Sequence, residues 1–351
     1  MSTVGQGRRV TLRDVAKRAG VSPTAASFVL SDRDDQRISE GTKERVRAAA
    51  AELDYRPNLT ARTLRTGTSG TIALVSEFLS TTPYAGAALK GALETARQHG
   101  ALLYIAETLG ETDIEHELLR GLLDRRVDGF VYAAMFTHTV RIPELLRDAP
   151  LVLLNCVTND VEVPMVVPDE IESGAAAARE LLEAGHREGI HFIGALPSGK
   201  RGGSQWKGRA ALALTDRIKG VKAELRRHGC GLASSPAVTD WEPEDGRRAV
   251  ADLLAHGGKP RALICANDRL AFGAYQALGD AKLAIPDDVS VVSFDHSEIA
   301  GWLHPTLTSL ALPHAEMGRL AVEQILSAER TRGRLKVPMP LHRGGSVASP
   351  G

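Results

Sequence analysis

The stretch TLRDVAKRAGVSPTAASFVL, residues 11–30, decides the fold of the N-terminal part of the chain. Thr11 is a good N-cap, and Asp14 stands three residues later, where a capping-box carboxylate reaches back to the cap. Apolar residues follow at helical spacing as far as Gly20, which accepts the left-handed conformation that ends a helix. Pro23 then suits the first position of a second helix. The stretch therefore predicts two short helices joined by a tight turn, as in a helix-turn-helix.

The second helix has one face for packing and one face for a partner. Its packing face is formed by Ala26, Val29 and Leu30, and its outward face by Thr24, Ser27 and Phe28. Small alanines allow a close crossing with the first helix, and a single helix is narrow enough to enter the major groove of DNA. An αα-hairpin that binds nothing is the alternative explanation of the same pattern.

The distribution of charge favours DNA binding by this head. Residues 1–70 contain 13 Lys and Arg against 8 Asp and Glu, although the 351-residue chain has a formal net charge of zero. A basic segment on an acidic remainder indicates a polyanionic partner for that segment alone. A solvated basic surface would give the same count, so the charge supports the motif and does not replace it.

The head continues with a third helix and a linker. Ser39 as an N-cap and apolar residues at helical spacing predict a helix that ends before Pro57, because the residue before a proline is disfavoured in the α conformation. Asn58 can cap a last short helix, LTARTL, at 59–64. The polar segment RTGTSG at 65–70 contains two glycines and predicts a linker between the head and the rest of the chain.

Composition narrows the class of protein. Hydrophobic residues make up 43% of the chain, which is enough for sizeable cores. Cys156, Cys230 and Cys265 are too dispersed for a disulfide framework or a zinc motif, which suggests a reducing compartment. The N-terminus has no apolar signal-peptide core, and no run reaches the roughly 18 apolar residues of a membrane helix. We therefore expect a cytoplasmic globular protein with no metal site and no cofactor.

From residue 71 onward, short apolar runs alternate with amphipathic stretches. We expect strands at 71–75, 101–106, 129–134, 150–156, 189–194, 261–266 and 289–294, and helices at 87–99, 115–126, 171–184, 216–228, 243–256 and 269–279. Buried parallel strands with helices on both faces produce such an alternation. The body is therefore predicted to be an α/β fold with two parallel sheets, in which ligands bind beyond the carboxyl ends of the strands.

Taken together, these features resemble the lac repressor family of bacterial transcription regulators. The helix-turn-helix matches in Asp14, Val15, Ala16, Val21, Ser22, Ala25, Val29 and Leu30, and Arg56-Pro57-Asn58 followed by Ala61-Arg62-Thr63-Leu64 is similar to the hinge helix of the family. The resemblance covers nearly the whole chain. It implies a helix-turn-helix head at 1–56, a hinge helix and linker at 57–70, and an effector domain like the type I periplasmic binding proteins. That domain would have an N-terminal subdomain at 71–167 and 312–339 and a C-terminal subdomain at 168–311 and 340–351.

The resemblance also implies which residues contact DNA: Thr11, Arg13, Pro23, Thr24, Ala25, Ser27, Phe28, Asn58, Ala61, Arg62 and Leu64. Thr24 and Ser27 can exchange hydrogen bonds with base edges, whereas Phe28 offers only apolar contact, for example with a thymine methyl group. The family commonly has arginine in place of Phe28, so the operator is expected to differ there. Leu64 matches the leucine that the family wedges into the minor groove. Packing of this leucine against the body is the alternative.

For the effector, the resemblance implies five contact residues: Asn155, Arg217, Trp241, Asn267 and Asp295. Asn155, Asn267 and Asp295 lie at or just past the ends of predicted strands, and Trp241 follows a further strand expected near Ala237. An indole face with amide, guanidinium and carboxyl groups suits a sugar, whose C–H face stacks and whose hydroxyls form hydrogen bonds. Simpler roles compete: Trp241 can belong to the core, Asp295 can cap its loop, and the neighbouring Asp268 is expected to cap the helix at 269–279 and not to bind ligand.

The connection at 195–216 includes part of an incomplete phosphate-binding motif. Gly194 to Lys200 fits the G-x-x-x-x-G-K pattern of a phosphate-binding loop, but Arg201 stands where the pattern needs Ser or Thr, and no long helix follows at once. Lys200, Arg201, Lys207 and Arg209 around Trp206 suit either an anionic ligand or a solvated loop, and we favour the loop. No dinucleotide fingerprint or nucleophile elbow occurs at a strand end, so the sequence does not predict an enzyme.

The function predicted from the sequence is a homodimeric, operator-binding regulator, and specifically a repressor. Its partners are a near-palindromic double-stranded DNA site and a small metabolite, expected to be a sugar, bound between the subdomains. Ligand and DNA would then be coupled through the short helix at 59–64, which is too short to be stable alone. The alternative is a metabolite-binding protein or sugar-active enzyme whose helical head does not bind DNA specifically.

Overall fold

The computed structural model describes residues 10–30, 38–56, 63, 67–77, 85–195 and 212–350. Its contacts divide the chain into two units, Met1–Ser69 and Gly70–Gly351, which we describe separately. Several residues singled out in the sequence lie outside the described ranges. These are Asn58, Ala61, Arg62, Leu64 and the cations and tryptophan of the 195–216 connection, namely Lys200, Arg201, Trp206, Lys207 and Arg209.

The first unit contains a three-helix head: α1 (Leu12–Ala19), α2 (Pro23–Leu30) and α3 (Glu40–Glu52). The predicted capping box is present, since Thr11 and Asp14 bond reciprocally at the start of α1, and Gly20 ends that helix at φ 68°. The core consists of Val15, Ala16, Ala19, Ala26, Val29, Val46 and Ala49. Leu30 is only partly buried beside this core. The predicted helix-turn-helix is therefore present, with small residues at the crossing.

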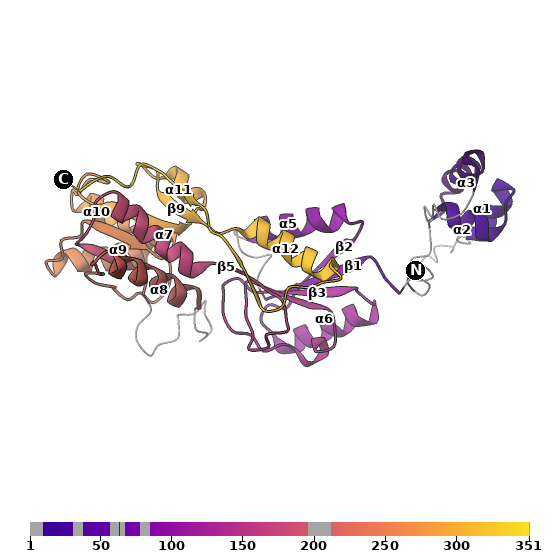
Figure 1. The fold of residues 1–351 in the computed structure, drawn as a ribbon, viewed down its shortest axis with the longest axis horizontal. Helices are drawn as coiled ribbons and strands as arrows, with labels where there is room; N and C mark the ends of the chain where they lie inside the picture. Colours follow the sequence, from indigo (N-terminus) through magenta and orange to yellow (C-terminus); the bar gives the residue numbers. More distant parts are fainter. Residues whose placement is uncertain are drawn as a thin grey trace, which may run out of the picture. The chain divides into compact units, whose positions relative to one another are not determined.

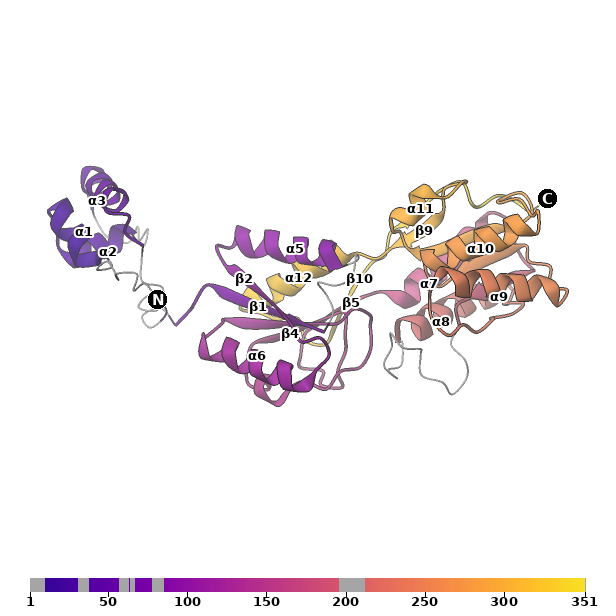
Figure 2. The ribbon, with the colours of Figure 1, turned by 180° about the vertical axis from the view of Figure 1, so that it is seen from behind.

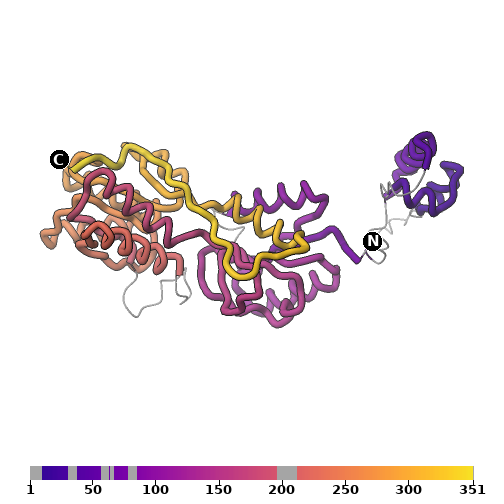
Figure 3. The backbone as a smooth tube through the Cα atoms, viewed as in Figure 1, coloured from indigo at the N-terminus to yellow at the C-terminus, as the bar shows by residue number. Residues whose placement is uncertain are grey.

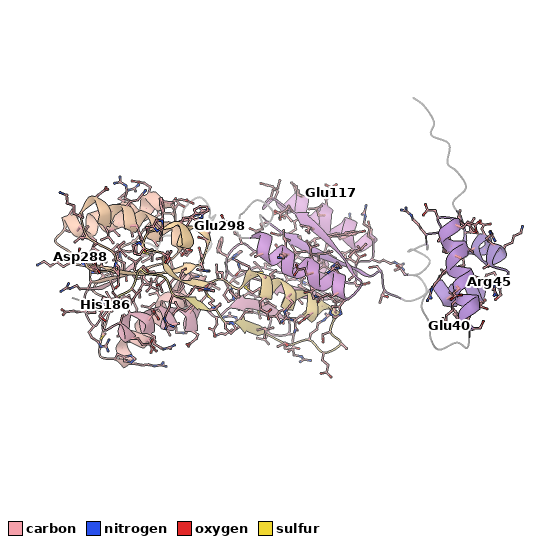
Figure 4. The ribbon with its side chains drawn as sticks, turned by 90° about the horizontal axis from the view of Figure 1, so that it is seen from above. Glu40, Arg45, Glu117, His186, Asp288 and Glu298 are labelled. Atoms are coloured by element: carbon pink, nitrogen blue, oxygen red, sulfur yellow. The ribbon has the colours of Figure 1, made fainter. Side chains whose placement is uncertain are left out.

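Polar contacts fix α3 against α1. Arg18 forms an ion pair with Glu52 at 2.7 Å, and the Arg45 Nε donates to the Ala19 carbonyl oxygen at 3.5 Å. Figure 4 shows Arg45 and Glu40 on α3. Exposed ion pairs contribute little to stability, so the apolar core holds the head together and these contacts orient its helices.

The second unit contains two lobes, each built on one sheet (Figure 1). The sheet of the first lobe has the strand order β10-β5-β4-β3-β1-β2, all parallel. Its strands are β1 (Thr71–Ser76), β2 (Leu102–Glu107), β3 (Gly129–Ala133), β4 (Leu151–Leu154), β5 (Met165–Pro168) and β10 (Arg334–Val337). Helices α5 (Ala85–Gln98) and α12 (His314–Leu326) cover one face, and α6 (Thr112–Asp124) with the 3-10 turn Glu144–Leu146 covers the other. Figure 2 shows the same layers from behind.

The sheet of the second lobe has the strand order β11-β9-β8-β7-β6, parallel except for β11. Its strands are β6 (Ile190–Ile193), β7 (Ala262–Cys265), β8 (Ser290–Asp295), β9 (Thr308–Ala311) and β11 (Leu341–His342). Its helices are α7 (Glu170–Glu183), α8 (Leu212–Arg227), α9 (Pro243–Ala255), α10 (Asp268–Asp280) and α11 (Glu298–Trp302). Phe192, Phe294 and many aliphatic residues fill its core.

The chain passes between the lobes three times: from β5 to α7, from β9 to α12, and from β10 to β11. The last passage is visible as the final part of the tube in Figure 3. The carboxyl ends of β5 and β9 both meet these crossovers, so side chains at the strand ends lie next to the connections between lobes. None of the helices in the described ranges is long and apolar enough to cross a membrane.

The α/β fold and its parallel sheets are as predicted, and the structure adds elements that the sequence analysis missed. Strands β5, β9, β10 and β11 and helix α12 were not among the predicted elements. Strands β9 (TSLA) and β10 (RLKV) mix polar and apolar residues and β11 has only two residues, so none of them forms an apolar run. Strand β5 (MVVP) was missed although it is as apolar as the strands that were predicted.

Candidate DNA-binding and effector sites

The outward face of α2 is the candidate DNA-reading surface. Thr24 is exposed, whereas Ser27 and Phe28 are half-buried. Arg13 and Pro23 are also exposed, while Ala25 is half-buried and its backbone N donates to the Ser22 hydroxyl at 3.1 Å. The Thr11 hydroxyl is engaged by Asp14 at 2.7 Å. Thr24 therefore has the freest polar group of this surface, and Thr11 acts first as a helix cap.

The effector candidates of the second lobe gather at the carboxyl edge of its sheet. The Arg217 Nη1 donates to the Ala266 carbonyl oxygen at 2.5 Å, just beyond β7. Asn267 follows, and its side-chain amide donates to the Trp241 carbonyl oxygen at 3.2 Å. Asp295 ends β8 and is close enough to Arg217 for their charges to interact. The fold thus brings Arg217, Trp241, Asn267 and Asp295 together from four separate segments.

Arg217 is buried in an ion pair that the sequence analysis did not foresee. Only 3% of its side chain is exposed, and its Nε and Nη2 donate to the two carboxylate oxygens of Glu170 at 2.7 and 2.8 Å. Its guanidinium carbon lies 4.3 Å from the centre of the Phe294 ring. Burial opposes the charge of Arg217, but Glu170, with smaller contributions from Asp295 and Asp268, outweighs burial, so the pKa of the guanidinium is raised. Glu170 is the first residue of α7, just after β5, and because β5 was not predicted, no sequence signal pointed to Glu170.

Asn267, and not the neighbouring Asp268, is the residue that caps α10. Asn267 is the N-cap of α10, because its side-chain oxygen accepts from the backbone N of Leu270 at 2.8 Å. The expectation that Asp268 caps this helix is therefore wrong. Asp268 is fully buried and accepts from the Ser297 backbone N, the Ser297 hydroxyl and the Ser309 hydroxyl. A cap must precede the helix by one residue to face its free N–H groups, which is the position of Asn267 and not of Asp268.

Asp295 occupies an unusual position at the end of β8. Its backbone has a φ of 97°, a conformation that L-residues rarely adopt, and its carbonyl oxygen accepts from the backbone N of Leu312 at 3.3 Å. Burial and then the neighbouring Asp268 raise the pKa of its carboxyl group well above the usual range, against the effect of Arg217. Backbone outliers gather at functional sites, so this residue fits a binding role.

Trp241 and Asn155 have internal partners as well. Trp241 is half-buried and packs against the core of the second lobe. Asn155, in the first lobe at φ 56°, accepts from the Thr137 hydroxyl at 2.7 Å and donates to the carbonyl oxygens of Ala134 and Met135. It therefore holds the segment after β3. The Thr137 carbonyl oxygen in turn accepts from the backbone N of Leu212 at the start of α8, which connects this segment to the second lobe.

The candidate site does not coincide with two grooves on the described surface. A groove of about 1330 Å³ lies in the first lobe and is lined by segments that precede β4, β5 and β10. A smaller one of about 700 Å³ lies along α8, beside Ile218 and Lys222. None of the five effector candidates lines either groove. The described residues contain no cluster of metal-ligating side chains.

His314, at the crossover into α12, is a second residue that the sequence analysis missed. Its Nε2 is buried and has no hydrogen-bond partner among the described residues. Burial lowers the pKa of this imidazole from 6.5 to about 4. Burying a charged imidazole without a counter-ion costs free energy, so His314 should be uncharged in the folded protein at neutral pH.

We expect the folded protein to lose stability as the pH falls from 7 to 5, in part through His314. The unfolded chain protonates His314 near pH 6.5 and the folded chain only near pH 4. Neutral His314 therefore causes no loss of folding free energy above pH 6.5, and its penalty grows as the pH falls between these two values. The share of His314 should be about 2 kcal/mol between pH 7 and pH 5. Urea unfolding at both pH values should show a smaller pH effect for His314→Phe than for the wild type. Equal pH effects in the two proteins would contradict the assignment, because buried His186 and His191, whose pKa values are also lowered, are common to both.

Comparison with known proteins relates both units to the lacI family of bacterial regulatory proteins. Residues 11–58 match the model of bacterial regulatory proteins of the lacI family, and residues 69–343 match that of periplasmic binding proteins and the sugar binding domain of the LacI family. The chain is 34% identical to the sucrose operon repressor of Shigella flexneri, over 94% of this chain and 98% of that protein. It is 30% identical to the ribose operon repressor of Escherichia coli K12, over 90% and 92%.

The fold is also that of a solved structure with low sequence similarity. The lac repressor dimer bound to operator and an anti-inducer matches with a TM-score of 0.76 at 22% identity, covering 97% of this chain and all of that one. The two family models and the relatives span the head and the body in the order seen here. The similarity therefore extends to the whole organisation of the chain and not to one motif.

Proposed function

Because the chain belongs to the lacI family of bacterial regulatory proteins, we propose that it is a repressor that binds a near-palindromic operator as a homodimer and responds to a sugar. That it is a DNA-binding transcription regulator and not an enzyme follows from the family. The observation that carries the finer proposal is the head: a capped helix-turn-helix whose second helix has Thr24 exposed and Ser27 and Phe28 half-buried on one side. Such a regulator acts in the cytoplasm, on the nucleoid.

Operator recognition is assigned to α2 and its surroundings. Thr24 and Ser27 would bond base edges and Phe28 would contact a thymine methyl group, while Arg13 and the backbone near Pro23 position the helix on phosphates. Asn58, Ala61, Arg62 and Leu64 lie outside the described residues, and their proposed hinge contacts rest on the family match at 11–58 and the hinge pattern around it.

The effector is proposed to bind beyond the carboxyl ends of the second sheet, facing the first lobe. The division of the body into subdomains at 71–167 with 312–339 and at 168–311 with 340–351 belongs to this proposal. Trp241 and Asp295 would contact the ligand, with Arg217 and Asn267 behind them and Asn155 opposite. The repressors of sucrose and ribose operons among the relatives support a sugar as the ligand. Ligand closure would change the support of the short hinge helix and thereby the operator affinity.

The dimer is proposed to form at the edge of the first sheet. β2 is the terminal strand there, and no described strand pairs with its outer side. Leu102, Tyr104 and Ile105 on β2 are 59%, 42% and 42% exposed, and Leu109 follows at 49%. An apolar edge strand left open would aggregate, and proteins normally cover one. A second copy related by a two-fold axis covers it and places two heads on a palindromic site.

Selection of sequences from a pool of genomic DNA tests the proposal. The purified protein should enrich a near-palindromic sequence, and the sugar that raises its melting temperature should change the affinity for that sequence. Failure to enrich any sequence would instead support a metabolite-binding protein without specific DNA binding.

Changing the reading face provides a sharper version of this test. The Thr24→Ala/Ser27→Ala variant should lose at least about tenfold in affinity for the selected operator and little for unrelated DNA, because each base contact contributes roughly 1–3 kcal/mol of discrimination. Ser39→Ala serves as the control, because Ser39 is an exposed residue at the N-cap position of α3 whose hydroxyl forms no cap bond with that helix. Equal losses on both DNAs would move base reading away from α2. Fluorescence anisotropy at fixed salt gives both affinities.

A further inference from the structure

The ion pair between Glu170 and Arg217 neutralises the guanidinium of Arg217, so this arginine offers no free positive charge to a ligand in the candidate effector site. Both oxygens of Glu170 accept from the guanidinium, and the pair is nearly inaccessible, with exposed fractions of 5% and 3%. A bidentate pair of this kind has fixed geometry and is strong when it is desolvated. An anionic ligand could pair with Arg217 only by displacing the carboxylate of Glu170, which is part of the same chain and cannot diffuse away.

The other charges at this edge follow the same pattern. Arg269, at the start of α10, pairs with Glu242 at 2.6 Å. Three of the other described titratable groups there are carboxyls: Asp268, which accepts three hydrogen bonds, Asp295, and Asp240, one of whose oxygens is buried without a partner among the described residues. Another is His296, which stacks on His342 and whose pKa is lowered, chiefly by partial burial. Among the described residues, each arginine at this edge has a glutamate, and carboxyl groups are in excess.

This arrangement favours one kind of ligand over another. Hydroxyl groups can donate to an ionised carboxylate and can also exchange hydrogen bonds with a protonated carboxyl group, so they suit these side chains in either state. An anionic ligand would lose its hydration and find no free counter-ion among the described arginines, because Arg217 and Arg269 are already paired with glutamates.

We infer that Glu170 sets the charge class of the effector: by neutralising Arg217 it makes the site accept an uncharged polyhydroxyl ligand and reject phosphorylated or carboxylated ones. The inference rests on the effector site proposed above and adds its selectivity. Glu170 is thus a specificity residue that acts through Arg217. Removing its charge while keeping its shape turns Arg217 into an anion-binding group.

Thermal-shift titration with inorganic phosphate tests this without knowledge of the natural ligand. Glu170→Gln should be stabilised by phosphate at concentrations at least tenfold below any at which the wild type responds. Glu172→Gln is the matched control, because Glu172 loses the same charge two residues further along α7, where it is exposed and pairs only with Arg179. A folded Glu170→Gln protein that responds like Glu172→Gln would overturn the inference.

The wild type supplies a test that does not depend on folding of the variant. D-ribose, D-fructose and D-glucose are compared with ribose 5-phosphate, fructose 6-phosphate and glucose 6-phosphate in the same assay, with inorganic phosphate as the minimal anion. Absence of stabilisation by phosphate and by all three esters is the expected result. Saturable stabilisation of the wild type by phosphate or by any of the three esters, beyond the stabilisation that sulfate gives at the same concentration, would overturn the inference. Operator binding is measured in parallel, because its absence would refute the proposed regulator while leaving the ligand comparison unaffected.

Discussion

Gly273→Ala is expected to destabilise the protein by at least about 3 kcal/mol, whereas Gly279→Ala in the same helix should leave it unchanged or slightly more stable. A Cβ at Gly273 would lie 2.6 Å from the Arg247 backbone N and still closer to the Pro243 carbonyl oxygen, both on α9. Real Cβ atoms essentially never approach within 3.0 Å. Because both neighbours are backbone, α9 and α10 must separate to admit one methyl group.

Gly279 provides the matched control for this substitution. It is also in α10, and a Cβ there meets nothing within 4 Å. Alanine is favoured over glycine inside a helix by up to about 1 kcal/mol, and somewhat less near its end. Urea unfolding of both variants measures the difference. Similar midpoints for the two would show that the crossing of α9 and α10 adapts easily, in conflict with the close contact seen here.

The same close crossing occurs three times in the body, which makes the prediction general. A Cβ on Gly246 of α9 would collide with the Leu270 backbone of α10. The pair Gly174 and Gly220 does the same for α7 and α8, and the pair Gly91 and Gly318 for α5 and α12. Each helix of a pair contributes one glycine at its contact with the other. Since α8 carries Arg217, the crossing at Gly174 and Gly220 also sets the position of the ion pair with Glu170.

The head was the part of the fold most open to prediction from sequence, for a physical reason. Caps, turns and helical periodicity act within a few residues, and Thr11, Asp14 and Gly20 perform in the structure the roles that their local chemistry suggests. The predicted strands of the body were found because each lies in a run of mostly apolar residues, including β4, β6 and β7, which have only four residues each. Strands β10 and β11 escaped because exposed residues such as Arg334 and His342 interrupt any apolar pattern.

The candidate site was less predictable, because its interactions join residues that are distant in sequence. Glu170 and Arg217 are 47 positions apart, and nothing local to either one announces the other. Asn267 and Asp268 are adjacent, and only the helix start observed at Asp268 decides which of them is the cap. The strand-end rule did place Asn155, Asn267 and Asp295 correctly at carboxyl edges, since that rule follows from the topology of parallel sheets.

Charges introduced on β2 should abolish the proposed dimer and, with it, tight operator binding. In the Leu102→Glu/Tyr104→Glu variant, two carboxylates would face their own copies across a two-fold axis on an apolar surface. The cost of burying them should leave the protein monomeric at micromolar concentrations. Both side chains are exposed in the single chain, at 59% and 42%, so the fold of each copy should be unaffected.

The effect on DNA binding should be larger than that of any single change in the head. Two linked heads engage a palindrome with an effective concentration that raises affinity by roughly 10²–10⁴ over one head, and a monomer forfeits this gain. Val161→Glu is the control, because Val161 is a comparably exposed apolar residue, 67% accessible, before β5 and thus toward the opposite side of the sheet. Light scattering after size-exclusion chromatography gives the oligomeric state, and anisotropy on the selected operator gives the affinity. A dimeric β2 variant with wild-type affinity would place the interface elsewhere, whereas a monomer that still binds tightly would show that one head suffices.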